Sequence, residues 1–143
     1  ADVPIVALTA HVGQDEREGG LRAILHFGHT FGHAIETGFG YGRYLHGEAV
    51  AMGMVVATRL SQRLGRVDVQ WADRIVALID AAGLAIRAPA MAAAQWLSLM
   101  RVDKKAEAGE IRYVLLDGRG KALVQAVADD VVVECITACT DTR

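Results

Sequence analysis

The chain has 143 residues, a formal net charge of −2 and an apolar fraction of 52%. A chain of this length forms one domain, or one lobe of a larger one. Its acidic and basic residues are interspersed, which argues against a nucleic-acid partner or an anionic membrane surface. The longest apolar run, Ala49–Ala57, is far too short to span a bilayer, and the first residues lack the pattern of a secretory signal.

The first half of the chain predicts two helices after an unreadable segment, residues 1–14. Apolar residues recur at helical spacing from about Leu21 to Gly38. A Gly/Tyr-rich connection follows, and a second helix is expected from about Gly47 to Leu64. Because the first half of this second helix is apolar on all sides, it should lie in the middle of a bundle.

The second half predicts two further helices, one β-hairpin and a last helix. The expected segments are 68–83 with Asp68 as the N-cap, 90–102 after Pro89, strands 111–116 and 121–124, and a helix capped by Asp129 or Asp130. The predicted fold is therefore mainly α, a helical bundle with one small β-hairpin.

The two cysteines, Cys135 and Cys139, are four residues apart in the last predicted helix. A disulfide inside a regular helix has poor geometry, so we expect both thiols to be reduced and buried. This pattern fits a cytoplasmic, reducing compartment.

Four of the five histidines lie within residues 22–48. His29 and His33 are one helical turn apart, and His26 extends the same face by three residues. His46 opens the second helix, and a short connection tends to lay two helices side by side. Imidazoles on facing helices suit a zinc-like divalent metal. The alternative is a helix pair whose partly buried histidines bond to the backbone.

Two glycines favour the metal hypothesis over that alternative. Gly28 and Gly32 lie inside the helical pattern, where each costs about 1 kcal/mol relative to alanine. Such a cost indicates the close approach of another backbone or of a ligand.

These motifs resemble a known family. F-G-H-T-F-G-H-A-I-E at 27–36 and Y-G-R-Y-L-H-G-E-A-V-A-M-G-M at 41–54 resemble the metal-binding signature of the 3-dehydroquinate synthases, which are sugar-phosphate cyclases. D-E-R-E-G-G-L-R upstream and D-K-K with G-E-I-R-Y-V-L-L downstream extend the resemblance from Asp15 over nearly the whole chain. Only the carboxy-terminal domain of the family is represented.

The resemblance implies a function. Residues 1–143 would be a single metal- and substrate-binding helical domain, without the amino-terminal NAD-binding domain. The full enzyme, a homodimer by this resemblance, would convert 3-deoxy-arabino-heptulosonate 7-phosphate to 3-dehydroquinate and phosphate in the shikimate pathway. Its cofactors would be Zn²⁺ or Co²⁺ and NAD, and the isolated chain is expected to be inactive.

The family also implies roles at the metal. His29 and His46 match its two histidine ligands, while its third ligand, a carboxylate, lies upstream in sequence that this chain does not contain. His33 matches a histidine beside the substrate, where an imidazole of near-neutral pKa can pass protons. Other readings of His33 are a second metal ligand or a structural histidine.

Cations are implied for the phosphate and carboxylate of the substrate. Arg22 matches a substrate arginine of the family, and Lys104 or Lys105 matches a substrate lysine. His26 occupies a substrate-binding position where the family usually has Asn. A second departure is Leu8, where the family usually has Lys.

Other functions remain open from the sequence. The chain could belong to another sugar-phosphate cyclase, such as a deoxy-inosose synthase, or to a metal-dependent alcohol or glycerol dehydrogenase. It could also be a non-catalytic helical module. It has no G-x-G-x-x-G motif for a nucleotide, so we expect either a fragment of the enzyme or a diverged relative.

Overall fold

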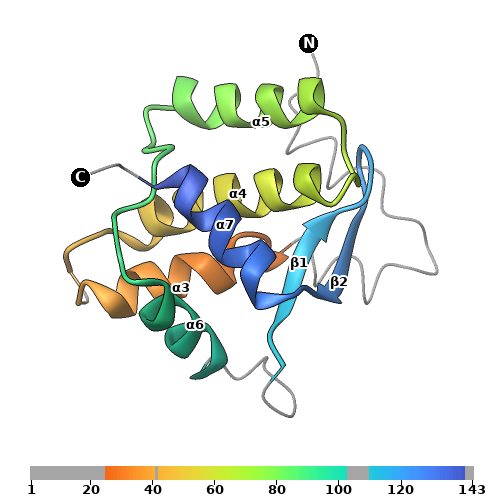
Figure 1. Cartoon of the computed structure of the whole chain (residues 1–143). Coiled ribbons are helices and arrows are strands. Elements are labelled where there is room, and N and C mark those ends of the chain that lie inside the picture. Colours follow the sequence, from red (N-terminus) through yellow and green to blue (C-terminus); the bar gives the residue numbers. More distant parts are fainter. Residues whose placement is uncertain (1–24, 41, 103–109, 141–143) are drawn as a thin grey trace.

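The computed structural model describes residues 25–40, 42–102 and 110–140 (Figure 1). Within these ranges the chain forms five helices and one antiparallel hairpin, so the predicted mainly α fold is confirmed. The elements are α3 (His29–Gly38), α4 (His46–Arg63), α5 (Val69–Ala81), α6 (Ala93–Val102), β1 (Arg112–Leu116), β2 (Ala122–Ala126) and α7 (Asp129–Cys139). No helix in the described ranges is both long and apolar enough to cross a bilayer.

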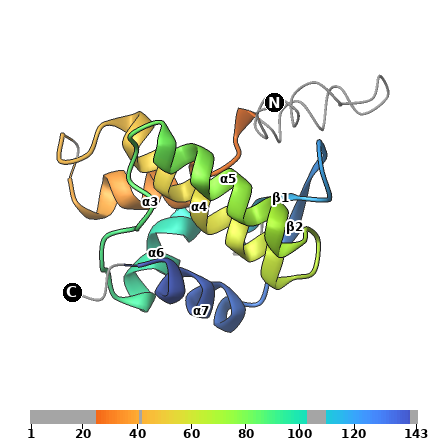
Figure 2. The same ribbon diagram turned by 90° about the horizontal axis from the view of Figure 1, so that it is seen from above.

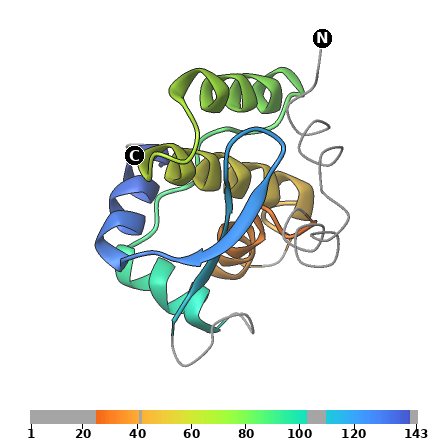
Figure 3. The same cartoon turned by 90° about the vertical axis from the view of Figure 1, so that its right-hand side faces the viewer.

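Helix α4 lies at the centre of the fold. It packs against α3, α5, α7 and β1, and two views show it between α5 on one side and α3 on the other (Figures 1 and 3). Seen from above, α5 lies along α4 (Figure 2). Residues on every face of α4 are buried, among them Ala49, Val55, Ala57 and Thr58. The all-round apolar pattern therefore predicted the position of this helix correctly.

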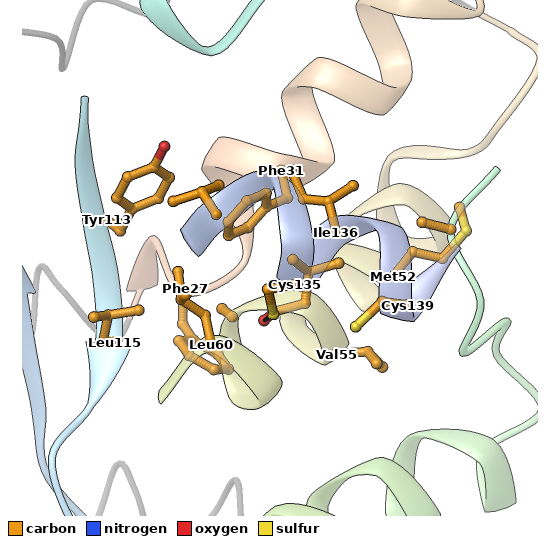
Figure 4. Packing of buried hydrophobic residues seen from close by; sticks show 14 of the residues in the cluster. Phe27, Phe31, Met52, Val55, Leu60, Tyr113, Leu115, Cys135, Ile136 and Cys139 are labelled. Atoms are coloured by element: carbon orange, nitrogen blue, oxygen red, sulfur yellow. Dashed lines mark hydrogen bonds between the residues drawn. The ribbon is translucent and has the colours of Figure 1, made fainter. Parts of the chain in front are cut away.

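The hydrophobic core fills the space between α3, α4, α7 and the hairpin (Figure 4). Phe31 of α3 stacks on Tyr113 of β1, with ring centroids 5.5 Å apart and planes inclined by 21°. Cys135 and Ile136 bring the inner face of α7 to the same core. Because α3 contributes its buried face here, its other face is left for the histidines.

The hairpin is fixed to α4 by a buried hydroxyl. Strands β1 and β2 pair from Arg112–Ala126 to Leu116–Ala122. The Ser61 hydroxyl donates to the Ala57 carbonyl at 2.7 Å and accepts from the Leu116 N–H at 2.9 Å. One side chain thus satisfies a strand-end amide inside the core, where an unpaired amide would be costly.

The first predicted helix is wrong at its start. Residues 21–24 lie outside the described ranges, and the helix does not run continuously from Leu25 to Gly38. Gly28 adopts a left-handed conformation with φ of 82°, so α3 begins only at His29. His26 therefore lies in the turn before α3, not on the face of the same helix.

Two other predicted helix starts also shift. Helix α6 begins at Ala93, three residues after the expected start at Ala90. In α7 the N-cap is Ala128, and Asp129 and Asp130 lie in the first turn, where they suit the positive end of the helix dipole. The predicted cap of α5 is confirmed, since Asp68 Oδ1 accepts from the Trp71 N–H at 2.7 Å.

Helices α3 and α4 touch through their backbones. A Cβ atom built on Gly53 would lie 2.1 Å from the Gly28 carbonyl oxygen and 2.8 Å from the Gly32 nitrogen. A Cβ atom on Gly32 would lie 3.0 Å from the Val50 Cα. The glycines therefore permit the close approach of another backbone, which is one of the two explanations that the sequence suggested.

We predict that replacing Gly53 destabilises the fold while replacing Gly47 does not. Both glycines belong to α4, but a Cβ on Gly47 meets nothing within 4 Å. Gly53→Ala should lower the free energy of unfolding by about 3 kcal/mol, because backbone atoms must move apart. Gly47→Ala should be neutral or stabilise by up to about 1 kcal/mol. Urea unfolding of the two variants measures the difference, and equal midpoints would contradict the packing described here.

Candidate metal centre

Four histidines gather at one end of the α3–α4 pair. His29 and His33 lie one turn apart at the start of α3, His26 lies in the turn before it, and His46 is the first residue of α4. The His29 ring centroid is 5.6 Å from that of His26, 5.5 Å from that of His33 and 5.5 Å from that of His46. The centroids of His33 and His46 are 6.0 Å apart. The structure thus brings the predicted ligand pair and the predicted proton-transfer histidine together.

Local structure at both helix starts explains this convergence. The left-handed turn at Gly28 lets the His29 N–H donate to the His26 carbonyl at 3.0 Å, which folds the two rings together. At the other start, the Leu45 N–H donates to Glu48 Oε1 at 2.8 Å, which fixes the entry into α4 directly beside His46. Both contacts are local in sequence and fix only the start of each helix. The packing of α3 against α4 then brings the two helix starts together.

The spacing of His29 and His46 fits one shared metal ion. Two imidazoles that bind one zinc ion through Zn–N bonds of about 2 Å have ring centroids roughly 5 Å apart. The observed separation of 5.5 Å needs only a small adjustment to meet this geometry. The ligand role of the two residues stays a prediction.

His29 has electrostatic surroundings that favour its neutral form. Burial lowers the pKa of His29 below its ordinary value of 6.5. The Phe27 carbonyl, 3.4 Å from Nδ1, opposes this shift, and the three neighbouring histidines add to it. Because a metal binds the unprotonated imidazole, a lowered pKa keeps His29 in the binding form at neutral pH.

A carboxylate that the sequence reasoning missed completes the cluster. Glu36 of α3 is buried, and its Oε1 accepts a hydrogen bond from His46 Nδ1 at 2.9 Å. His33, Glu36 and His46 each offer one ligand atom, and these three atoms lie within 4.8 Å of one another. The signal in the sequence was spacing, since Glu36 follows His33 by three residues and His29 by seven, on one helix face.

A comparison with known protein families gives a match over most of the chain. Residues 5–106 match the family model described as 3-dehydroquinate synthase C-terminal. The chain belongs to this family.

Solved structures of related proteins share the fold. A 2-epi-5-epi-valiolone synthase from Streptomyces hygroscopicus subsp. jinggangensis 5008, solved with NAD⁺ and Zn²⁺ bound, superposes with a TM-score of 0.71 over 81% of this chain at 20% identity. A 2-deoxy-scyllo-inosose synthase superposes with a TM-score of 0.65 over 81% at 25% identity. A structure of 2-deoxy-scyllo-inosose synthase with carbaglucose-6-phosphate, NAD⁺ and Co²⁺ gives 0.68 over 87% at 23% identity.

The chain spans about a third of the length of these proteins. The matched part is 32% of the valiolone synthase, and 32% and 36% of the two inosose synthase chains. The activity of a whole family member is therefore a proposal for this chain.

Most of the substrate residues that the family implies lie outside the described ranges. Arg22, Lys104 and Lys105 are among residues 1–24 and 103–109, so their places stay predictions. His26 is described, half-buried beside His29, where the family usually has Asn.

The cysteines belong to a different part of the molecule. Cys135 and Cys139 are free and buried on α7, as the sequence predicted. They line a cavity of about 410 Å³ together with Arg59, Arg63 and Arg87. No histidine of the cluster lines this cavity, so the thiols take no part in the candidate metal centre.

We predict that His29 makes stability depend on pH in the metal-free chain. In the unfolded chain His29 binds a proton near pH 6.5, whereas in the folded chain it does so only at lower pH. The free energy of unfolding should therefore fall as the pH drops from 6.5 through the folded pKa of His29, because the unfolded state binds more protons. Urea unfolding from pH 7 to pH 5 measures this fall.

The variant His29→Gln serves as the control, because it removes the titrating ring and should flatten this part of the profile. Titration of the His29 ring at or above pH 6.5, followed by nuclear magnetic resonance, would contradict the prediction.

Proposed function

We propose that this chain is the metal- and substrate-binding part of a 3-dehydroquinate synthase, which converts 3-deoxy-arabino-heptulosonate 7-phosphate to 3-dehydroquinate and phosphate. The observation that carries the proposal is the convergence of His29 and His46 from two helices, with centroids 5.5 Å apart. The family match over residues 5–106 supports it.

Cofactors would supply the chemistry that side chains cannot. A bound divalent metal would polarise an alcohol or ketone oxygen of the substrate, and NAD bound by another domain would take and return a hydride. The valiolone and inosose synthases described above hold NAD⁺ with Zn²⁺ or Co²⁺. We assign His29 and His46 as this chain's two ligands, and a third would come from sequence outside it.

His33 is placed to handle protons. Its ring is exposed and lies 5.5 Å from that of His29 and 6.0 Å from that of His46, so it borders the proposed metal position from the open side. Loss of phosphate next to a ketone requires that a proton leave the adjacent carbon. An imidazole is suited to accept and return a proton at neutral pH.

The substrate carries two anionic groups that need cations. We assign Arg22 to one of them and Lys104 or Lys105 to the other, because these residues match the family's substrate positions. A guanidinium forms paired hydrogen bonds with phosphate or carboxylate, and an ammonium acts as a point charge. His26, whose ring lies beside that of His29, would offer a ring nitrogen in place of an amide.

Another sugar-phosphate cyclase is the second candidate. The three solved structures described above are valiolone and inosose synthases, and 25% is the highest identity among them. The replacement of Asn by His26 at a substrate position also favours a changed substrate. Both candidates keep the same metal position and differ in the sugar phosphate they take.

We predict phosphate release when this chain is mixed with the separately expressed NAD-binding domain of a 3-dehydroquinate synthase, NAD and Zn²⁺. The heptulosonate phosphate should release phosphate, because the mixture restores the third ligand and the hydride acceptor. Glucose 6-phosphate, the natural sugar counterpart of carbaglucose-6-phosphate, should release none. A colorimetric phosphate assay measures both.

The outcomes of this assay separate the candidates. Release from glucose 6-phosphate alone would favour an inosose synthase. Release from neither substrate, with a properly folded chain and bound metal, would favour a non-catalytic module.

We predict different losses for His33→Gln and His29→Gln in the reconstituted enzyme. His33→Gln should lower kcat by about 10²- to 10⁴-fold, because proton transfer slows, while the metal content stays. His29→Gln should lower the metal content itself. Metal analysis of the purified variants beside kcat separates the two roles, and metal loss in His33→Gln would make His33 a ligand instead.

A further inference from the structure

We propose that Glu36 is a positioning residue, which holds the His46 ring with its proton on Nδ1 and leaves Nε2 as the nitrogen for the metal. This inference rests on the proposed function, because it needs His46 to be a ligand. It adds a residue that neither the sequence motif nor the family's ligand set assigned.

The chemistry of the contact fixes the tautomer. Glu36 Oε1 and His46 Nδ1 are 2.9 Å apart, a normal hydrogen-bond distance. An ionised carboxylate can only accept, so the shared hydrogen belongs to Nδ1. A neutral imidazole carries one ring hydrogen, and Nε2 is then the unprotonated nitrogen. Histidines that bind metals commonly donate their other ring N–H to a carboxylate in this way.

Burial shows which partner controls the other. The Glu36 side chain is 10% exposed, whereas that of His46 is 57% exposed. Glu36 follows Ala34 and Ile35, which anchor this turn of α3 in the core at 2% and 0% exposure. The packed helix α3 therefore fixes the Glu36 carboxylate. The exposed His46 imidazole at the start of α4 is the group that the hydrogen bond orients.

Direct ligation by Glu36 is the competing interpretation. His33, Glu36 and His46 offer three ligand atoms within 4.8 Å of one another, enough to suggest a site of two histidines and one carboxylate. Two observations favour positioning. Glu36 Oε1 lies 2.9 Å from His46 Nδ1, a hydrogen-bond distance that is too short for two atoms bound to one tetrahedral metal ion. The His29–His46 centroid separation of 5.5 Å is also nearer to that of a shared ion than the 6.0 Å of His33–His46.

The test uses the 143-residue chain labelled with ¹⁵N. Long-range ¹H–¹⁵N spectra of the metal-free protein report the tautomer of each histidine, and competition with a coloured chelator gives the affinity for Co²⁺. In the unaltered chain His46 should be protonated on Nδ1. Glu36→Ala should lose this preference and lower Co²⁺ affinity about 10- to 100-fold.

Two further variants make the result specific. Glu36→Gln keeps an acceptor oxygen of the same shape, so it should retain the tautomer and lose less than about 10-fold in affinity. Glu48→Gln removes a negative charge two residues from His46 but keeps an oxygen that can accept from the Leu45 N–H, so the entry into α4 is retained and both readouts should stay unchanged. Circular dichroism checks that every variant is folded.

Three results would overturn the proposal. One is an Nε2-protonated His46 in the unaltered chain. A second is an unchanged tautomer and affinity in folded Glu36→Ala. The third is a loss of Co²⁺ affinity in Glu36→Gln as large as that in His46→Gln, while His29→Gln keeps its Co²⁺ affinity. This result would make Glu36 a ligand. Failure of the proposed function would appear differently, as absent phosphate release with the tautomer and the metal affinity intact.

Discussion

The close contact between α3 and α4 is the constraint on which the candidate site depends. Gly53 has no side chain because the Gly28 carbonyl and the Gly32 nitrogen occupy that space. Any residue with a Cβ would separate the two helices, and the ring of His46, carried by α4, would move away from that of His29, carried by α3. Glycine lowers helix stability by about 1 kcal/mol, so these positions weaken the helices locally in exchange for a short distance between their backbones.

The same contact also shapes the chain before α3. Gly28 turns left-handed against the backbone of Met54, and this turn places Phe27 in the core and His26 beside His29. A helix running through Gly28 would have carried His26 along the α3 face instead. The cluster of four rings is therefore a product of tertiary packing, imposed on a segment whose local pattern favours a continuous helix.

The sequence predicted the elements better than their starting points. The central place of α4 and the Asp68 cap followed from patterns that are local and strong. The break at Gly28 did not, because the residue packed against this turn is Met54, which is distant in sequence. The start of α7 was assigned to the wrong residue, since Asp129 in the first turn gains from the helix dipole without capping.

For the candidate site, too, the sequence predicted local features but not the contacts between helices. The spacing of His29, His33 and His46 was enough to predict a common position, because helical geometry and a short connection leave few alternatives. Glu36 was missed for a physical reason. An acidic residue in a helix is usually taken to be solvated, and only the fold reveals that Glu36 is buried with His46 as its partner. Its spacing from His33 places it near the histidines of α3, but its hydrogen bond joins two helices, so spacing within α3 alone does not reveal the partner.

The exposure of the cluster indicates what this chain contributes to the proposed reaction. His29 and Glu36 are partly or fully buried, whereas His33 and His46 are exposed, and neighbouring Leu45 is 71% exposed. Hydrogen bonds and charges act strongly on a reacting group only where water is excluded. The part of the chain that the structure describes fixes nitrogen donors and one carboxylate in place, and within it the outer side of His33 and His46 is exposed. The proposed chemistry therefore needs a cover over this face as much as it needs a third ligand and NAD. Under the proposed function, the described helices α3 and α4 would place the metal, and the cover would come from residues outside the described ranges or from the NAD-binding domain.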